Sequence, residues 1–157
     1  MTLAQTSISG RFVRFAAAAA LGLAAAISPV AASAHSYKLG SLRIGHVWAK
    51  PAAKGEDAIV YGPIFNTAPE PAALKGASSP AATATELRSA VDGANKRLDA
   101  IALPPGRPVA LAPWREHIVL TGLKQPLQNG DAVDLDLDFG SLGKISVQVE
   151  IEDQASD

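Results

Sequence analysis

Hydrophobic and polar residues alternate strictly in two segments near the end of the chain. From Val133 to Phe139 every second residue is apolar and an aspartate stands between each pair, and from Ile145 to Glu152 apolar residues again alternate with polar ones. Successive side chains of a strand point to opposite faces, so this period predicts two strands that each bury one face. The intervening Gly140–Gly143 predicts the turn of a hairpin.

Four upstream segments also predict strands, at Leu39–Trp48, Ala58–Asn66, Ala84–Ala90 and Glu116–Thr121. Prolines punctuate the gaps between them and argue against long helices; they stand at positions 63, 69, 71, 80, 104, 105, 108, 113 and 126. Short strands separated by turn residues are typical of a sandwich. We therefore predict an all-β fold, an antiparallel β-sandwich of about seven or more short strands, in one domain over residues 35–157.

The N-terminal segment has the pattern of a secretory signal peptide. Arg11 and Arg14 precede an apolar run from Phe15 to Ile27, and Ala32-Ser33-Ala34 supplies the small residues that a signal peptidase reads. The apolar run is shorter than the roughly 20 residues that span a membrane. We expect residues 1–34 to be removed, which would leave a periplasmic protein that does not itself span the membrane.

Composition excludes several kinds of chemistry. Of the 157 residues 48% are hydrophobic, and the formal net charge of −1 offers no strong basic field for nucleic acid. The absence of cysteine rules out disulfides, thiolate zinc sites, iron–sulfur clusters and a cysteine nucleophile. The single methionine is Met1, so a processed chain would contain no sulfur ligand.

Motifs for calcium binding and catalysis are incomplete. The aspartates of 134–138 open like a calcium loop, but Phe139 stands where that loop needs glycine and Ile145 where it needs glutamate. A solvated strand face explains them better. Gly76–Pro80 lacks the second glycine of a nucleophile elbow, and the three histidines have no metalloprotease spacing. We expect no enzymatic activity.

Several segments together resemble a known family. They are Gly45–Lys50, Leu74–Pro80, Glu86-Leu87, Leu103–Gly106, His117–Leu127 and Gly130-Asp131. In this order they resemble the PCu(A)C family of periplasmic copper chaperones. The resemblance implies a cupredoxin-like β-sandwich, copper as the cofactor, and a role in delivering copper to cytochrome oxidase or in copper homeostasis.

The resemblance also implies a Cu(I) site, which this sequence has largely lost. The family gathers a His-x-Met pair, a further Met and a second His-x-Met pair, soft ligands that suit Cu(I). Here the first pair falls on Arg88 and Ala90, the middle Met aligns near Leu98, and the last pair becomes His117 and Val119. A guanidinium cannot coordinate a cation, so Arg88 is expected to attract an anion or Glu116 instead.

The three histidines have different interpretations. His117 is a candidate metal ligand or a retained residue hydrogen-bonded at the rim. His46 is interpreted as structural, and the nearby Trp48 as a core anchor. Cleavage after Ala34 would let the amine and imidazole of His35 chelate one metal, and cleavage after Ala32 would place His35 third from a free amine, an arrangement suited to Cu(II). Alternatively, His35 is incidental on a frayed terminus.

These observations predict a periplasmic copper-chaperone-like protein that passes copper to a membrane or periplasmic receiver. Its Cu(I) site is degenerate, and Cu(II) would bind through His35 with His117 in support. The alternative is a metal-free binding module that keeps the sandwich and contacts a partner through the rim at Trp114–Glu116.

Overall fold

The computed structural model describes residues 35–153, so the predicted signal peptide of residues 1–34 lies outside the described residues. This part of the chain is built from strands, with two short 3₁₀ turns, and contains no helix long and apolar enough to cross a membrane. The strands are β1 (Tyr37–Leu39), β2 (Leu42–Ile44), β3 (Trp48–Ala49), β4 (Ala58–Asn66), β5 (Ala72–Leu74), β6 (Gly76–Ser78), β7 (Ala82–Ser89), β8 (Lys96–Leu98), β9 (Ile101–Leu103), β10 (Pro108–Leu111), β11 (Glu116–Leu123), β12 (Ala132–Asp138) and β13 (Lys144–Ile151).

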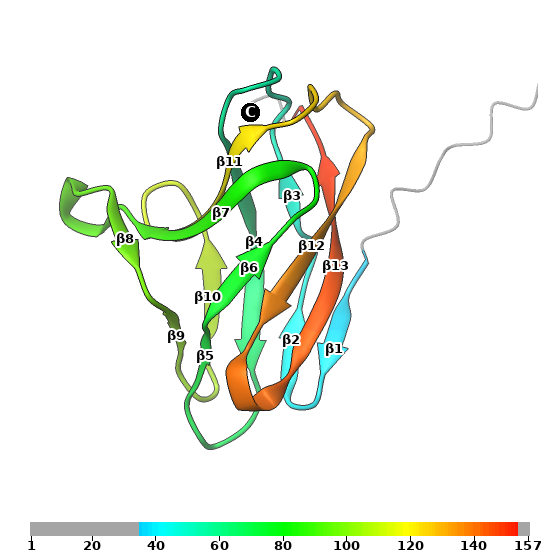
Figure 1. Ribbon diagram of the computed structural model, residues 1–157. Coiled ribbons are helices and arrows are strands. Elements are labelled where there is room, and N and C mark those ends of the chain that lie inside the picture. Colours follow the sequence, from blue (N-terminus) through cyan, green and yellow to red (C-terminus); the bar gives the residue numbers. More distant parts are fainter. Residues whose placement is uncertain (1–34, 154–157) are drawn as a thin grey trace, which may run out of the picture. The chain divides into compact units, whose positions relative to one another are not determined.

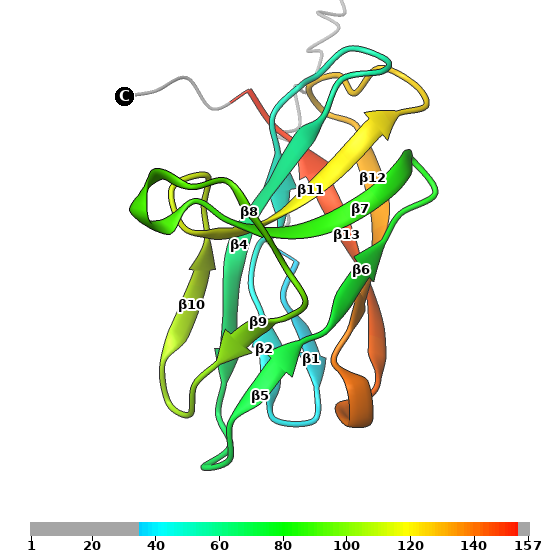
Figure 2. The same cartoon turned by 60° about the vertical axis from the view of Figure 1, so that its left-hand side comes forward.

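Most of these strands form one curled sheet whose halves enclose the core (Figures 1 and 2). The order along it is β6-β12-β13-β3-β4-β11-β7-β8, with β2 and β10 added along the far half of β4 and β1 paired to β2. The segments β5 and β9 form a separate two-stranded pair. The result is the predicted cupredoxin-like β-sandwich.

The central strand β4 belongs to both halves of this arrangement. Its residues Ala58–Val60 pair with β11, whereas Gly62–Phe65 pair with β10. Side chains from both halves meet in one apolar core, of which the largest fully buried members are Leu42, Ile44, Ile64, Leu74, Ile101, Leu103, Ile118, Leu120, Leu123, Leu135, Leu137 and Ile151. Such burial is the main favourable term in folding a chain of this size.

The structure confirms the predicted strand at 58–66 and corrects the one at Leu39–Trp48. That segment is divided: β1 and β2 form a hairpin around Gly40 and Ser41, and β3 begins only at Trp48. Gly40 has a φ of 55°, a left-handed conformation that glycine adopts without strain and that reverses the chain here. The segment is therefore three short strands instead of one.

One strand pairing is parallel, contrary to an entirely antiparallel sandwich. Trp48 and Ala49 of β3 lie beside Glu150 and Ile151 of β13 and run in the same direction. The amide of Glu150 donates to the carbonyl of Val47 over 3.0 Å, and the amide of Glu152 donates to that of Ala49 over 2.9 Å. Two parallel strands cannot be joined by a tight turn and need a long connection. β3 and β13 meet this condition because they lie far apart in the sequence.

The aspartates of β12 face outward, as the alternation predicts. Lys144 pairs with Asp138 over 2.9 Å, and its hydrogen bond lowers the pKa of the Asp138 carboxyl while raising that of the ammonium. The hydroxyl of Ser146 donates to Asp136. These side chains therefore form polar contacts on the solvent-exposed face of the β12–β13 hairpin.

The alternation in β12 generates a stability prediction. Leu135 is fully buried and Asp134 beside it is exposed, so Leu135→Ala should lower the free energy of unfolding by about 3 kcal/mol, whereas Asp134→Asn should change it by less than about 0.5 kcal/mol. Urea unfolding of both variants measures the difference. Equal effects would contradict the assignment of the two faces.

Candidate metal-binding sites

His117 lies near the start of β11 and is almost fully buried, with 2% of the residue exposed. Its Nδ1 lies 2.9 Å from the carbonyl oxygen of Arg115. A carbonyl can only accept a hydrogen bond, so Nδ1 carries a proton, and Nε2 is the ring nitrogen available to a metal. A backbone carbonyl fixes many metal-binding imidazoles in this way. The ring is therefore held in a form that could bind a metal.

Arg88 stands directly opposite His117 in the pairing of β7 with β11. Its guanidinium contacts the carboxylate of Glu86 through Nη2 at 2.7 Å and Nε at 2.8 Å, and Arg97 approaches the same carboxylate at 3.6 Å. The expected partner Glu116 instead lies 3.7 Å from Arg115. The partner of Arg88 is thus Glu86, which is nearest because residues two apart on a strand share a face.

The pairing registers also show which of the aligned positions share that face. Val119 is opposite Glu86 and lies two residues from His117, so it shares the side occupied by Arg88. Leu98 pairs with Leu87 and therefore lies on the other face, packed against the core. The residue of β8 on the same side as Arg88 is Arg97. Position 98 therefore does not face His117 and could not supply a metal ligand beside it, contrary to the alignment of the middle Met with Leu98.

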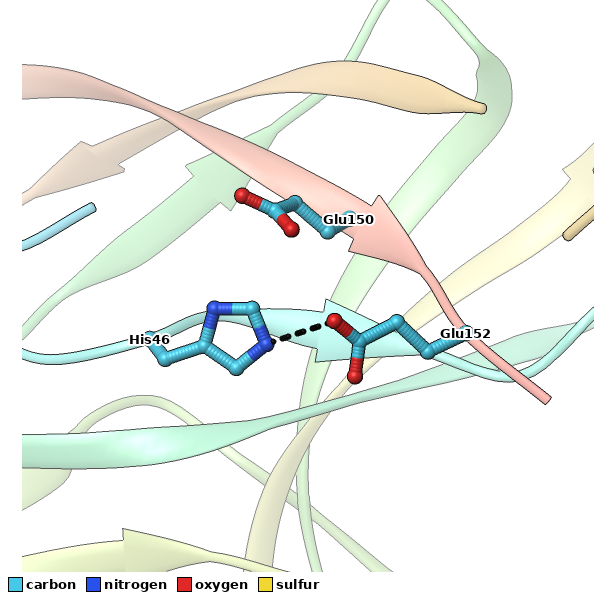
Figure 3. Close-up of side chains that lie close together, drawn as sticks. All are labelled: His46, Glu150 and Glu152. Atoms are coloured by element: carbon cyan, nitrogen blue, oxygen red, sulfur yellow. Dashed lines mark hydrogen bonds and ion pairs between the residues drawn. The ribbon is translucent and has the colours of Figure 1, made fainter. Parts of the chain in front are cut away.

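A second group of titratable side chains lies where β3 meets β13. His46 directs Nε2 at Glu152 over 3.0 Å, and a carboxylate oxygen of Glu150 lies close to both (Figure 3). One ligand atom from each of these three residues lies within 4.8 Å of the other two. We call His46, Glu150 and Glu152 the strand-end cluster.

His35 joins the edge of the strand-end cluster. Its Nδ1 lies 3.1 Å from Oε1 of Glu150, although 115 residues separate the two in sequence. The β1–β2 hairpin pairs Tyr37 with Ile44 and so brings the segment of His35 alongside the segment that leads to His46. The two histidines are therefore brought to the same carboxylates by a local turn.

The structure thus groups His35 with His46 and leaves His117 with other partners. In the order of the sheet, β13 and β11 are separated by β3 and β4. Sequence reasoning named His35 but missed His46 and the two glutamates. The glycine-centred turn at Gly40-Ser41 was the available signal, and reading Leu39–Trp48 as one strand concealed it.

Trp48 flanks the strand-end cluster and is only half-buried, so the prediction of a core anchor is wrong. In β3 it is Ala49 that points into the core. The indole stacks on Tyr61 of the neighbouring β4, with ring centroids 4.2 Å apart and an interplanar angle of 14°. Partial burial raises the pKa of the Tyr61 phenol, so it remains protonated at neutral pH.

The rim before His117 is bulky and accessible. Trp114 is 71% exposed, and the Arg115 side chain beside it is 51% exposed. The carbonyl of Arg115 accepts hydrogen bonds from the Ala90 amide at 3.0 Å and from His117. The backbone of the rim therefore holds the imidazole, while its large side chains face solvent.

Comparison with known proteins places the chain in a family. The family model described as "Putative lipoprotein LpqE-like" matches residues 42–151. The chain belongs to the LpqE-like family. A curated relative of this LpqE-like chain is the "Putative lipoprotein Lxx21020" of Leifsonia xyli subsp. xyli, 32% identical over 129 residues that cover 78% of this chain and 77% of that protein.

Solved structures confirm the resemblance to PCu(A)C domains. The copper-bound PCuAC domain from PmoF2 is 29% identical to this LpqE-like chain with a TM-score of 0.67, and the match covers 75% of this chain and 97% of that domain. The Cu(I) form of DR1885 from Deinococcus radiodurans is 24% identical with a TM-score of 0.59, over 70% and 78% of the two chains, and shares the fold. None of these names is that of an enzyme.

Proposed function

We propose that this LpqE-like chain is an exported copper-chaperone-like protein that binds Cu(II) through nitrogen ligands, with the Cu(I) site of its relatives degenerate. The family membership and the copper-bound PCuAC relative support the general function. Copper would pass from it to a membrane or periplasmic receiver. Export rests on the signal-like pattern of residues 1–34.

The observation that carries the proposal is the Arg88–Glu86 pair beside His117. Glu86 is bonded to Arg88 and close to Arg97, so two permanent cations lie near the imidazole that would bind Cu(I). Positive charges repel a metal cation, and the only methionine of the chain is Met1. Imidazole without thioether or thiolate is a poor match for Cu(I).

His35 supplies the alternative chemistry. Cleavage after Ala34 would add a free amine to its imidazole, and cleavage after Ala32 would add an amine and amide nitrogens, both of which suit the tetragonal preference of Cu(II). The contact of the His35 imidazole with the Glu150 carboxylate supports this proposal, because an anion beside the ring would favour a bound cation. His117 then remains a supporting ligand at most, since in the sheet β11 is separated by β3 and β4 from β13, which carries the Glu150 partner of His35.

The relatives are named putative lipoproteins, whereas this chain has no residue through which a thioether- or thioester-linked lipid could be attached. Attachment of a lipid through sulfur requires a cysteine, and the sequence contains none. A terminus without an acyl group keeps its amine free for a metal, which is consistent with the role given to His35.

The first prediction compares the two oxidation states of copper. The processed protein should bind Cu(II) with one-to-one stoichiometry and lose Cu(I) to a chelator probe, because its donors are nitrogen and oxygen. His35→Ala, and a form with extra residues before Ser33, should each bind Cu(II) at least tenfold more weakly. Aerobic calorimetry and anaerobic competition measure these affinities.

Tight one-to-one retention of Cu(I) by the native protein would contradict the proposed degeneracy. Equal Cu(II) binding by the native, extended and His35→Ala forms would remove His35 from the site. Failure of all forms to bind either ion would favour the metal-free alternative, in which the exposed Trp114 of the rim contacts a partner.

The second prediction restores the missing ligands. Combining Arg88→His, Ala90→Met and Val119→Met should create Cu(I) binding. Arg88 and Val119 lie on the side of His117 in the β7–β11 pair, and Ala90 directly follows β7, where its amide donates to the carbonyl of Arg115. Glu86 would keep Arg97 as a charged neighbour. Arg88→His alone is the matched control and should gain little, because it supplies no sulfur. A folded triple variant without Cu(I) affinity would mean that the geometry of the β7–β8 hairpin is the larger defect.

A further inference from the structure

The strand-end cluster has the donor set of a divalent cation site that requires no free N-terminus. It offers one imidazole nitrogen and two carboxylates, all within 4.8 Å of one another. The three side chains converge from the segment before β3 and from the end of β13 (Figure 3). They are half-buried, with 29% of the His46, 23% of the Glu150 and 27% of the Glu152 side chain exposed, so an ion can reach them from solvent.

The backbone holds this arrangement in place without a metal. Glu150 and Glu152 are two residues apart along an extended segment, so their side chains leave the same face. The parallel bonds from their amides to Val47 and Ala49 fix that face beside His46. The ordering cost of bringing the three ligands together is therefore met by folding and not by the ion.

A close backbone contact positions His46 from the other side. Gly62 of β4 has a φ of 143°, and a Cβ at this position would lie 2.6 Å from the carbonyl oxygen of His46. Only glycine lets β4 approach this closely. The path of the chain at His46 thus depends on Gly62.

The charges of the strand-end cluster favour a dication. Two carboxylates that share a site repel each other, and a bound cation removes this repulsion. The ion pair of Glu150 is with His35, which adds a second imidazole at the edge of the same site. Imidazole and carboxylate together select late first-row divalent ions, among which Cu²⁺ binds such donors more tightly than Zn²⁺.

We propose that His46, Glu150 and Glu152 form a binding site for a late first-row divalent cation, with Cu²⁺ preferred to Zn²⁺. This goes beyond the proposed function, because it requires neither the amine of residue 35 nor His117. The competing interpretation is an ion pair of His46 and Glu152 that only fastens the end of β13. The two interpretations differ in what they predict for a side chain at position 46 that keeps the hydrogen bond to Glu152 but binds metal poorly. Such a side chain should preserve the structural role and abolish metal binding.

The decisive variants are His46→Gln and Glu152→Gln. The amide of His46→Gln can still donate a hydrogen bond to Glu152 but is a far weaker metal ligand, and Glu152→Gln removes one anionic ligand. Glu70→Gln, at an exposed carboxylate outside the cluster, is the matched control. All three variants are made in a protein that carries extra residues before Ser33, so that a chelate of the terminal amine with the His35 imidazole does not contribute.

Binding is followed by the fluorescence of Trp48, which pairs with Glu150 across β3 and β13. Trp114→Phe makes Trp48 the only tryptophan, because the chain has two. Cu²⁺ should quench this signal with one-to-one stoichiometry, and calorimetry should show weaker binding of Zn²⁺. His46→Gln and Glu152→Gln should each lower the Cu²⁺ affinity at least tenfold with unchanged melting of the metal-free protein, whereas Glu70→Gln should have no effect.

Cu²⁺ affinities of His46→Gln and Glu152→Gln equal to that of Glu70→Gln would overturn the proposal, as would tighter binding of Zn²⁺ than of Cu²⁺. Binding that disappears entirely on N-terminal extension would also overturn it, while leaving the His35 chelate of the proposed function intact. Binding that keeps its full affinity on extension but is lost with His46 would support the strand-end cluster and count against the terminal amine. The failures of the two proposals are therefore distinguishable.

Discussion

The parallel pairing of β3 with β13 is the constraint on which both the closure of the sheet and the strand-end cluster depend. It joins an early strand to the last one, so the sheet can curl and enclose the core between its halves. The bonds that make this junction also align Glu150 and Glu152 beside His46. Because this pairing is part of the sheet, the positions of Glu150 and Glu152 beside His46 are set by the fold and need no bound ion.

The two candidate sites have opposite electrostatic character. Beside His117, Glu86 neutralises part of the charge of Arg88 and Arg97, but the permanent cations outnumber the anion. At the strand-end cluster the carboxylates exceed the charge of the histidines unless both rings are protonated. A cation is thus repelled at one place and attracted at the other, although each contains an imidazole. The residues around a histidine decide its chemistry more than the histidine itself.

Sequence patterns predicted the parts of the fold that depend on local alternation. The β12–β13 hairpin has a clear period and was found, and the nine residues of β4 were also predicted as a strand. Short strands such as β5 and β9 offer three residues each, too few to show a period. The resemblance identified the fold and aligned Arg88 and His117 with ligand positions of one copper site, and the structure then paired the two across β7 and β11. It could not reveal the strand-end cluster, because the contact of His46 with Glu152 spans 106 residues and rests on a long-range parallel pairing.

The position of His35 links the terminus to this long-range geometry. In the proposed function, cuts after Ala34 and after Ala32 would give different amine ligands, yet both would retain His35, whose imidazole contacts Glu150 in the structure. The amine would then be an additional donor that depends on processing, whereas the carboxylates and His46 are brought together by the fold. A metal bound by both His35 and the strand-end cluster would connect the start of the folded domain to β13. Such a metal would oppose fraying of the terminus that supplies the amine.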